Sequence, residues 1–142
     1  LARYFLWEHS LDYDHGTGHG VGVFSNVHQG PQGITRINTV PLKPGMILSI
    51  EPGVYLEGKL GIRLENLVYV KRKSRYSGQK KEFLHFETLT LAPFEKNLIE
   101  KKLLSRDELL WLNSYHRNVY QKLSPFLGQT LKNWLKDTCK SL

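Results

Sequence analysis

The stretch of sequence that decides the fold reads His15-Gly16-Thr17-Gly18-His19-Gly20-Val21-Gly22. Two later stretches complete it, Ile50-Glu51-Pro52-Gly53 and Gly61-Ile62-Arg63-Leu64-Glu65-Asn66. Together they supply one imidazole, from His19, and two carboxylates, from Glu51 and Glu65. These three side chains lie too far apart in the sequence for one helix or loop to present them, so we expect a folded sheet to bring them together.

Strand geometry explains how these stretches could aim two carboxylates at one point. Residues two apart on an extended strand share a face, so Ser49, in a strand over 46–50, and Glu51, directly after it, are predicted to share one face. Arg63 and Glu65 are predicted to share a face of a second strand over 62–71. A neutral imidazole with carboxylates suits Mn²⁺, Co²⁺ or Zn²⁺. The pattern therefore predicts a site for a divalent metal.

Each of these residues also has an interpretation without a metal. Taken alone, Glu65 would be a carboxylate on a strand edge that pairs with Arg63, and His19 would be an ordinary histidine in a turn. The glycines of the 16–22 run could cradle a phosphate, but neither of the two common phosphate-binding glycine motifs is present. Only the combination of the three stretches favours the metal site.

The rest of the chain predicts an α+β fold. A helix is predicted over 1–9, a Gly-rich turn over 16–30 with a strand over 21–27, and further strands over 46–50, 54–56, 62–71 and 83–91. Ser105, with Glu108 three residues later, predicts the start of a helix that continues to Ser124-Pro125. A second helix is predicted from side chains at helical spacing: Leu127, Leu131, Trp134, Leu135 and Thr138.

These motifs carry a resemblance to a known family. Six stretches resemble, in matching order, the C-terminal part of aminopeptidase P: 16–22, 26–31, 42–46, 51–55, 61–66 and 111–116. This family is the Xaa-Pro aminopeptidase branch of the pita-bread metallopeptidases. The resemblance implies a curved antiparallel sheet covered by helices. It also implies an enzyme that hydrolyses the N-terminal Xaa-Pro bond of peptides with proline at the second position.

The resemblance implies a role for each candidate residue. The implied site holds two divalent ions, with Mn²⁺ expected and Zn²⁺ or Co²⁺ as alternatives, and three of its ligands match residues here: His19, Glu51 and Glu65. Beside the attacking water, Glu51 would also act as general base. His15 and His28 match histidines that contact the substrate, and Arg63 matches an arginine beside the ligands or in the substrate pocket.

Two aspartate ligands of the family and one further histidine have no counterpart in this sequence. Asp12 and Asp14 are the only aspartates before His15, and they lie directly before the Gly-rich run, which is the wrong place. We therefore expect residue 1 to be a boundary within a longer protein, whose upstream half is a required partner. The chain alone is expected to be inactive. Residues 1–93 would form the second half of the pita-bread domain, and residues 94–142 a helical extension.

A non-catalytic alternative comes from the same fold. Pita-bread domains also bind peptides or histones without catalysis, and a chain that lacks two ligands could belong to such a module. A pure binding module has no chemical need for the five matched residues His15, His19, His28, Glu51 and Glu65, so their joint presence argues for the enzyme. Two upstream aspartates would decide the question.

The charge and hydropathy of the sequence bear on whether the protein binds nucleic acid or a membrane. Residues 1–65 carry five Lys or Arg against six Asp or Glu, and residues 66–142 carry fifteen against seven, which gives the net charge of +7. The basic segment 71–81 could grip phosphates, but no nucleic-acid motif accompanies it, so we prefer a solvated hairpin tip and expect no nucleic-acid partner. No apolar run approaches the roughly 20 residues that span a bilayer, so no membrane partner is expected.

Cysteine content bears on the compartment. The single cysteine, Cys139, cannot form an intrachain disulfide or a thiolate metal site. Together with the lack of a leader-like segment in this sequence, it predicts a reducing compartment, and we expect a cytoplasmic protein. The sequence is compatible with a homodimer and does not decide between a monomer and a dimer.

Overall fold

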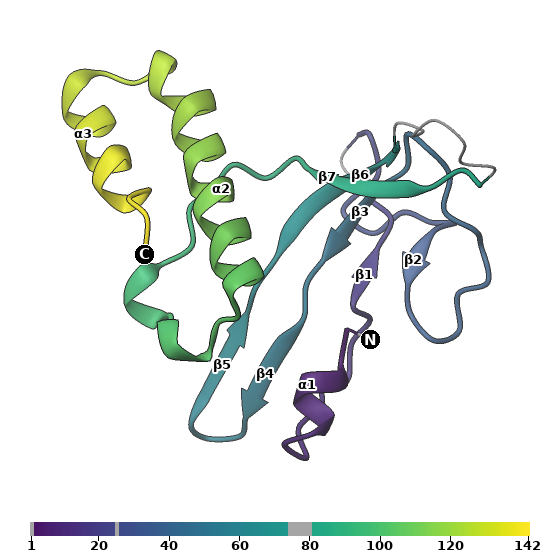
Figure 1. Ribbon diagram of the computed structural model, residues 1–142. Helices are drawn as coiled ribbons and strands as arrows, with labels where there is room; N and C mark the ends of the chain where they lie inside the picture. Colours follow the sequence, from purple (N-terminus) through teal and green to yellow (C-terminus); the bar gives the residue numbers. More distant parts are fainter. Residues whose placement is uncertain (1, 25, 74–80) are drawn as a thin grey trace. The chain divides into compact units, whose positions relative to one another are not determined.

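The computed structural model describes residues 2–24, 26–73 and 81–142, and the chain divides into two compact units. Unit 1 is Leu1–Thr90 and unit 2 is Leu91–Leu142. Unit 1 contains the short helix α1 (Tyr4–Trp7) and the described strands, whereas unit 2 contains the two long helices (Figure 1). The predicted α+β composition is therefore confirmed. The expected domain boundary between residues 93 and 94 stays a prediction.

The core of unit 1 lies on a three-stranded antiparallel sheet. Its strand order is β3 (Ile47–Ile50), β6 (Asn66–Arg72) and β7 (Leu84–Thr88). Leu48 pairs with Val68, and Val68 and Val70 bury the same face of β6, as the two-residue period of a strand requires. Four partly buried side chains pack against these three: Ile34, Leu42, Met46 and Ile50.

Two smaller antiparallel sheets complete unit 1. β1 (Gly18–His19) pairs with β2 (Gly33–Ile34), and β4 (Gly53–Leu56) pairs with β5 (Leu60–Arg63). The β4–β5 hairpin turns at Gly58, whose φ of +67° lies in the left-handed region that favours glycine. These sheets place the Gly-rich run and the two carboxylate stretches in one unit.

Three predictions about unit 1 are wrong. The predicted strand over 62–71 is two strands, β5 and β6, because the chain changes partners between them: β5 pairs with β4, whereas β6 pairs with β3 and β7. The predicted strand over 21–27 is absent from the described residues 21–24 and 26–27, and Gly22 N–H instead donates to the Asn26 carbonyl at 2.8 Å. The helix predicted over 1–9 is limited to the four residues of α1.

Unit 2 is a pair of helices, α2 (Arg106–Leu123) and α3 (Gln129–Thr138). Both helices are confirmed, and α2 begins with the predicted capping box of Ser105 and Glu108. Its core consists of Tyr115 and Val119 on α2 and Leu135 on α3. Three short 3₁₀ turns flank the helices: Lys96–Leu98, Lys101–Leu103 and Ser124–Phe126.

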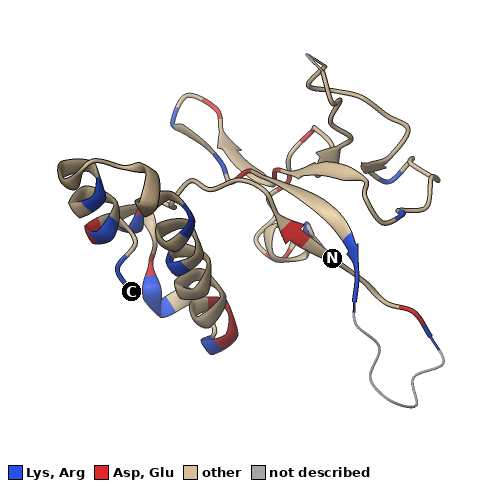
Figure 2. Ribbon diagram, turned by 90° about the horizontal axis from the view of Figure 1, so that it is seen from above, with Lys and Arg blue, Asp and Glu red and all other residues tan. Residues whose placement is uncertain are grey.

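Positive charge gathers on unit 2, which carries nine Lys or Arg against five Asp or Glu. Figure 2 shows blue positions along both helices and at the end of β6. The tip of the basic segment 71–81 lies outside the described residues, and at its flanks Lys71 pairs with Glu87 at 2.7 Å. Within the described ranges, no helix is long and apolar enough to cross a membrane.

Candidate metal centre

The strand that carries His19 runs against the strand that leads to Glu51. Glu51 N–H donates to the Thr17 carbonyl at 2.8 Å, and Gly20 forms an antiparallel bridge with Leu48. Gly18 permits this close approach, because a Cβ at that position would lie 2.0 Å from the Ser49 carbonyl oxygen. Gly18 therefore lets β1 lie against β3, whereas Gly20, after His19, leaves room for the Gln29 carbonyl oxygen, which would lie 2.0 Å from a Cβ there.

His19 and Glu51 are in direct contact. His19 Nε2 lies 3.1 Å from Glu51 Oε1, and His19 Nδ1 lies 2.9 Å from the Gly20 carbonyl oxygen. A carbonyl oxygen only accepts, so Nδ1 donates its proton to Gly20, and Nε2 is the ring atom that faces the carboxylate. A proton or a metal ion between Nε2 and Oε1 would bind to both atoms. The geometry fits a metal-ligating histidine, which commonly donates its other N–H to a carbonyl.

Arg63 connects Glu51 to a chain of hydrogen bonds. Its Nη1 lies 3.4 Å from Glu51 Oε2, and its Nε donates to the Tyr55 hydroxyl at 2.9 Å. The Tyr55 hydroxyl in turn lies 2.8 Å from His15 Nε2, whose ring partner Nδ1 lies 2.8 Å from the Gly16 carbonyl. His15 therefore carries its proton on Nδ1 and accepts from Tyr55. The hydrogen bond to Tyr55 is the main cause that raises the pKa of Arg63, which stays a cation beside Glu51.

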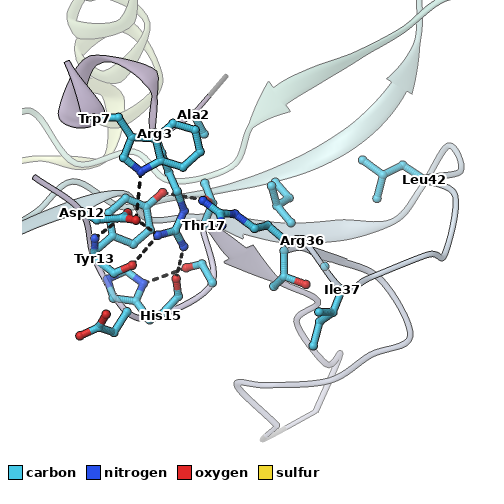
Figure 3. A pocket seen from close by; sticks show the side chains of 15 residues that line it. Ala2, Arg3, Trp7, Asp12, Tyr13, His15, Thr17, Arg36, Ile37 and Leu42 are labelled. Carbon is cyan, nitrogen blue, oxygen red and sulfur yellow. Dashed lines mark hydrogen bonds and ion pairs between the residues drawn. The ribbon is translucent and has the colours of Figure 1, made fainter. Parts of the chain in front are cut away.

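A second network holds the segment that presents His15 (Figure 3). The Arg3 guanidinium binds the Asp12 carboxylate at 2.6 Å, the Tyr13 carbonyl, and the His15 carbonyl at 2.5 Å. Trp7 Nε1 donates to the other Asp12 oxygen at 3.0 Å. These bonds, that of Trp7 first and then that of Arg3, lower the pKa of Asp12 to about 2. Asp12 thus orders this segment through Arg3 and Trp7.

Five candidate residues line one cavity of about 350 Å³: His15, His19, His28, Glu51 and Arg63. The exposed His28 lies with its ring centroid 4.2 Å from that of His19. A larger cavity of about 720 Å³, shown in Figure 3, shares His15, Gly16 and Thr35 with it. The two cavities are therefore neighbours, and His15 lies on the wall of both.

Glu65 is not among the residues that line this cavity. It is exposed and lies between β5 and β6, and its charge adds to the larger effects of Tyr55 and Glu51 that raise the pKa of Arg63. The expectation that Glu65 and Arg63 share a face stays a prediction. Among the residues that the structure describes, no three His, Cys, Asp or Glu side chains are grouped closely enough to hold a metal ion. His19 and Glu51 offer two donors of suitable chemistry, and the role of Glu65 as a third ligand stays a prediction.

Two residues of this network are absent from the predicted site, Ser49 and Tyr55. The alternation of β3 places Ser49 on the face of Glu51, and that was the available signal for it. Tyr55 reaches Arg63 because Gly53 has no side chain, since a Cβ there would lie 2.5 Å from the Tyr55 hydroxyl. Its position depends on the β4–β5 register, which pairs Gly53 with Arg63.

Comparison with known sequences identifies the class to which this fold and site belong. The family profile described as metallopeptidase family M24 matches residues 1–72. A second profile, described as the C-terminal region of peptidase M24, matches residues 82–142. The chain therefore belongs to metallopeptidase family M24.

Within this family, the chain is similar to proteins named Xaa-Pro aminopeptidase P. The chain is 49% identical to a probable Xaa-Pro aminopeptidase P of Botryotinia fuckeliana, over 96% of this chain and 22% of that protein. It is 48% identical to the one from Talaromyces marneffei, over 100% of this chain and 22% of that protein. The predicted resemblance to the C-terminal part of aminopeptidase P is confirmed, and the chain spans less than a quarter of the length of these relatives.

A solved structure confirms the fold. The X-prolyl aminopeptidase of Caenorhabditis elegans, described as a cytosolic enzyme with a di-nuclear active site, matches with a TM-score of 0.89 and 39% identity. The match covers 99% of this chain and 23% of that chain. The chain therefore has the α+β architecture expected for part of a pita-bread fold.

Proposed function

We propose that this chain is the C-terminal part of a dinuclear-metal Xaa-Pro aminopeptidase. The observation that carries the proposal is the 3.1 Å contact of His19 Nε2 with Glu51 Oε1, in a cavity that His15, His28 and Arg63 also line. The names of the relatives support the activity, and the description of the C. elegans enzyme supports two metals. The proposed substrates are peptides with proline at the second position.

The proposed metal ligands from this chain are His19, Glu51 and Glu65. Two aspartates from the upstream half of the same protein would complete the site, as the family resemblance implies. When bound, the two ions would polarise the scissile carbonyl and lower the pKa of the attacking water. Imidazole with carboxylates suits Mn²⁺, which we expect, and also Zn²⁺ and Co²⁺.

The side chains of this chain would divide the remaining work. Water adds to the carbonyl carbon while Glu51 accepts its proton, and the same proton passes to the proline nitrogen as the C–N bond breaks. His28 would donate to the oxygen that becomes negatively charged, a contribution of a few kcal/mol when the donor is preorganised. His15 would position the proline side of the peptide, and Arg63 would hold the Glu51 carboxylate in place.

The proposal extends to the organisation of the whole protein. Residues 1–93 would be the second half of the catalytic domain and residues 94–142 a helical extension. We propose a cytoplasmic location, which the cytosolic description of the C. elegans relative supports. A homodimer and the lack of nucleic-acid and membrane partners stay predictions.

Glu51→Gln in the full-length protein tests the proposed activity. The change removes the base and weakens metal binding, so we expect at least about a 10³-fold loss of kcat on an Xaa-Pro peptide, because general base catalysis contributes 10²–10⁴-fold. Glu57→Gln, at an exposed glutamate in the β4–β5 turn, is the matched control and should leave kcat unchanged. Turnover by Glu51→Gln within about tenfold of the parent would reject the role. Peptide binding without hydrolysis by the parent would favour the binding module.

A further inference from the structure

Where β1 lies against β3, one backbone N–H donates its hydrogen bond to a side chain in place of a backbone carbonyl. Two backbone bonds define the register, from Glu51 N–H to the Thr17 carbonyl at 2.8 Å and from Val21 N–H to the Ile47 carbonyl at 3.3 Å. The same register places His19 opposite Ser49, where an antiparallel ladder has the N–H of one residue donate to the carbonyl of the other. Instead, His19 N–H donates to the Ser49 hydroxyl at 2.9 Å.

The proton of the same hydroxyl goes to Glu51. Ser49 Oγ donates to Glu51 Oε1 at 2.9 Å, and this oxygen is the one that lies 3.1 Å from His19 Nε2. A hydroxyl has one proton and two lone pairs, so both interactions are made at once. Ser49 is fully buried, so water does not compete for either bond.

The two oxygens of Glu51 are therefore held from different sides. Oε1 accepts from Ser49, and Oε2 faces the Arg63 guanidinium at 3.4 Å. Donors on both oxygens restrict rotation of the carboxylate plane. One lone pair of Oε1 remains for a cation on the side of His19, because a carboxylate oxygen has two acceptor positions.

We propose that Ser49 is a positioning residue of the metal site, whose hydroxyl sets the placement of the Glu51 carboxylate relative to the His19 imidazole. The inference rests on the proposed function, because it assigns His19 and Glu51 to one metal. Side chains that orient metal ligands typically change metal affinity by 10–100-fold when they are removed. The effect is expected in the folded protein, in addition to any loss of stability.

Two substitutions of equal shape test the hydroxyl. Ser49→Thr keeps it, whereas Ser49→Val replaces it with a methyl group, and both introduce the same extra volume into a fully buried position. Affinity for Mn²⁺ is measured by titration calorimetry on the full-length protein, and thermal unfolding of the metal-free protein is recorded alongside. We expect Ser49→Thr to bind within about threefold of the parent and Ser49→Val to bind about 10–100-fold more weakly.

Equal Mn²⁺ affinity of the folded Thr and Val variants would overturn the inference and leave the proposed function standing, since only unfolding would then depend on the hydroxyl. Absence of Mn²⁺ binding by the parent would overturn the proposed function and the inference together. Ser49→Cys serves where Ser49→Val does not fold, because it is close in size to serine and its S–H is a weaker donor. Parent-like affinity of Ser49→Cys would contradict the inference, and weakened affinity would support it.

Discussion

Units 1 and 2 use buried polar groups in different ways. In unit 1, the buried Ser49 and Glu51 are bonded to each other and lie on the cavity side of β3, beside His19. In unit 2, the buried His116 accepts a hydrogen bond from Phe94 N–H at 3.1 Å and so fixes the segment before the helices. Burial in unit 1 thus serves a candidate site, whereas burial in unit 2 serves the fold.

Exposed apolar side chains do not separate the two units, because Val23 in unit 1 and Phe126 in unit 2 are exposed at 96% and 85%. The core of unit 2 joins α2 and α3 through Tyr115, Val119 and Leu135. The contrast lies in the buried polar groups. Substitutions at the candidate site of unit 1 should therefore change metal binding or catalysis more than stability, and substitutions in the core of unit 2 should do the reverse.

After Glu51→Gln, the largest effect is expected in unit 1 for His28→Ala in the full-length protein. His28 is exposed, so stability should change little, but loss of a preorganised donor to the transition state typically lowers kcat by 10²–10³-fold. The kcat of an Xaa-Pro peptide should fall more than KM rises. A loss carried by KM alone would make His28 a residue that binds the ground state, and the contrast between the units would weaken.

Leu135→Ala tests the opposite expectation in unit 2. Leu135 is 2% exposed, and truncation of a buried leucine costs about 3 kcal/mol of unfolding free energy. Urea unfolding followed by tryptophan fluorescence measures the loss. Leu131→Ala, on the same helix at 56% exposure, is the control and should cost less than about 1 kcal/mol. Equal losses for the two variants would show that α3 does not pack through Leu135.

A smaller effect is expected at His116 in unit 2. His116→Leu removes the acceptor of Phe94 N–H and should cost about 2 kcal/mol, whereas His116→Gln keeps an acceptor and should cost less. Comparison of the two variants by urea unfolding separates the hydrogen bond from the change of side chain. Equal losses of unfolding free energy in the two variants would show that the hydrogen bond from Phe94 N–H does not stabilise unit 2.

The pH dependence of unfolding sharpens the same prediction. Burial, followed by the charge of Lys96, lowers the pKa of His116 below its usual value of 6.5. In the unfolded chain, His116 therefore binds a proton at a higher pH than in the folded chain. The contribution of neutral His116 to the unfolding free energy is present above about pH 6.5 and is lost as pH falls below it. His116→Gln cannot titrate, and its unfolding free energy should decline less than that of the parent between pH 7 and 5. Parallel declines would contradict the role of His116.

Sequence patterns predicted best where interactions are local. The capping box of Ser105 and Glu108 closes within one turn of α2, and both long helices follow from residues three or four apart. β2 was not predicted, because Gly33 and Ile34 form a strand only through pairing with the distant Gly18 and His19. The break between β5 and β6 is missed for the same reason, because it marks the change from pairing with β4 to pairing with β3.

For the candidate site, the sequence identified most of the residues but few of the contacts between them. Residue types and the family resemblance selected His19, Glu51, His15, His28 and Arg63, and the structure brings all of them to one cavity, while their roles stay predictions. Apart from the shared face of Ser49 and Glu51, the links between them could not be predicted from the sequence. Ser49 and Tyr55 act through the β1–β3 and β4–β5 registers, which only the fold defines.

The central claim is that His19 and Glu51 bind one metal of a two-metal site. The most direct test is calorimetric titration of the full-length protein with Mn²⁺, comparing the parent, His19→Ala and the control His85→Ala, an exposed histidine on β7. We predict two ions for the parent and for His85→Ala, and loss of at least one ion or about a 100-fold weaker affinity for His19→Ala. Unchanged stoichiometry and affinity in His19→Ala would contradict the account.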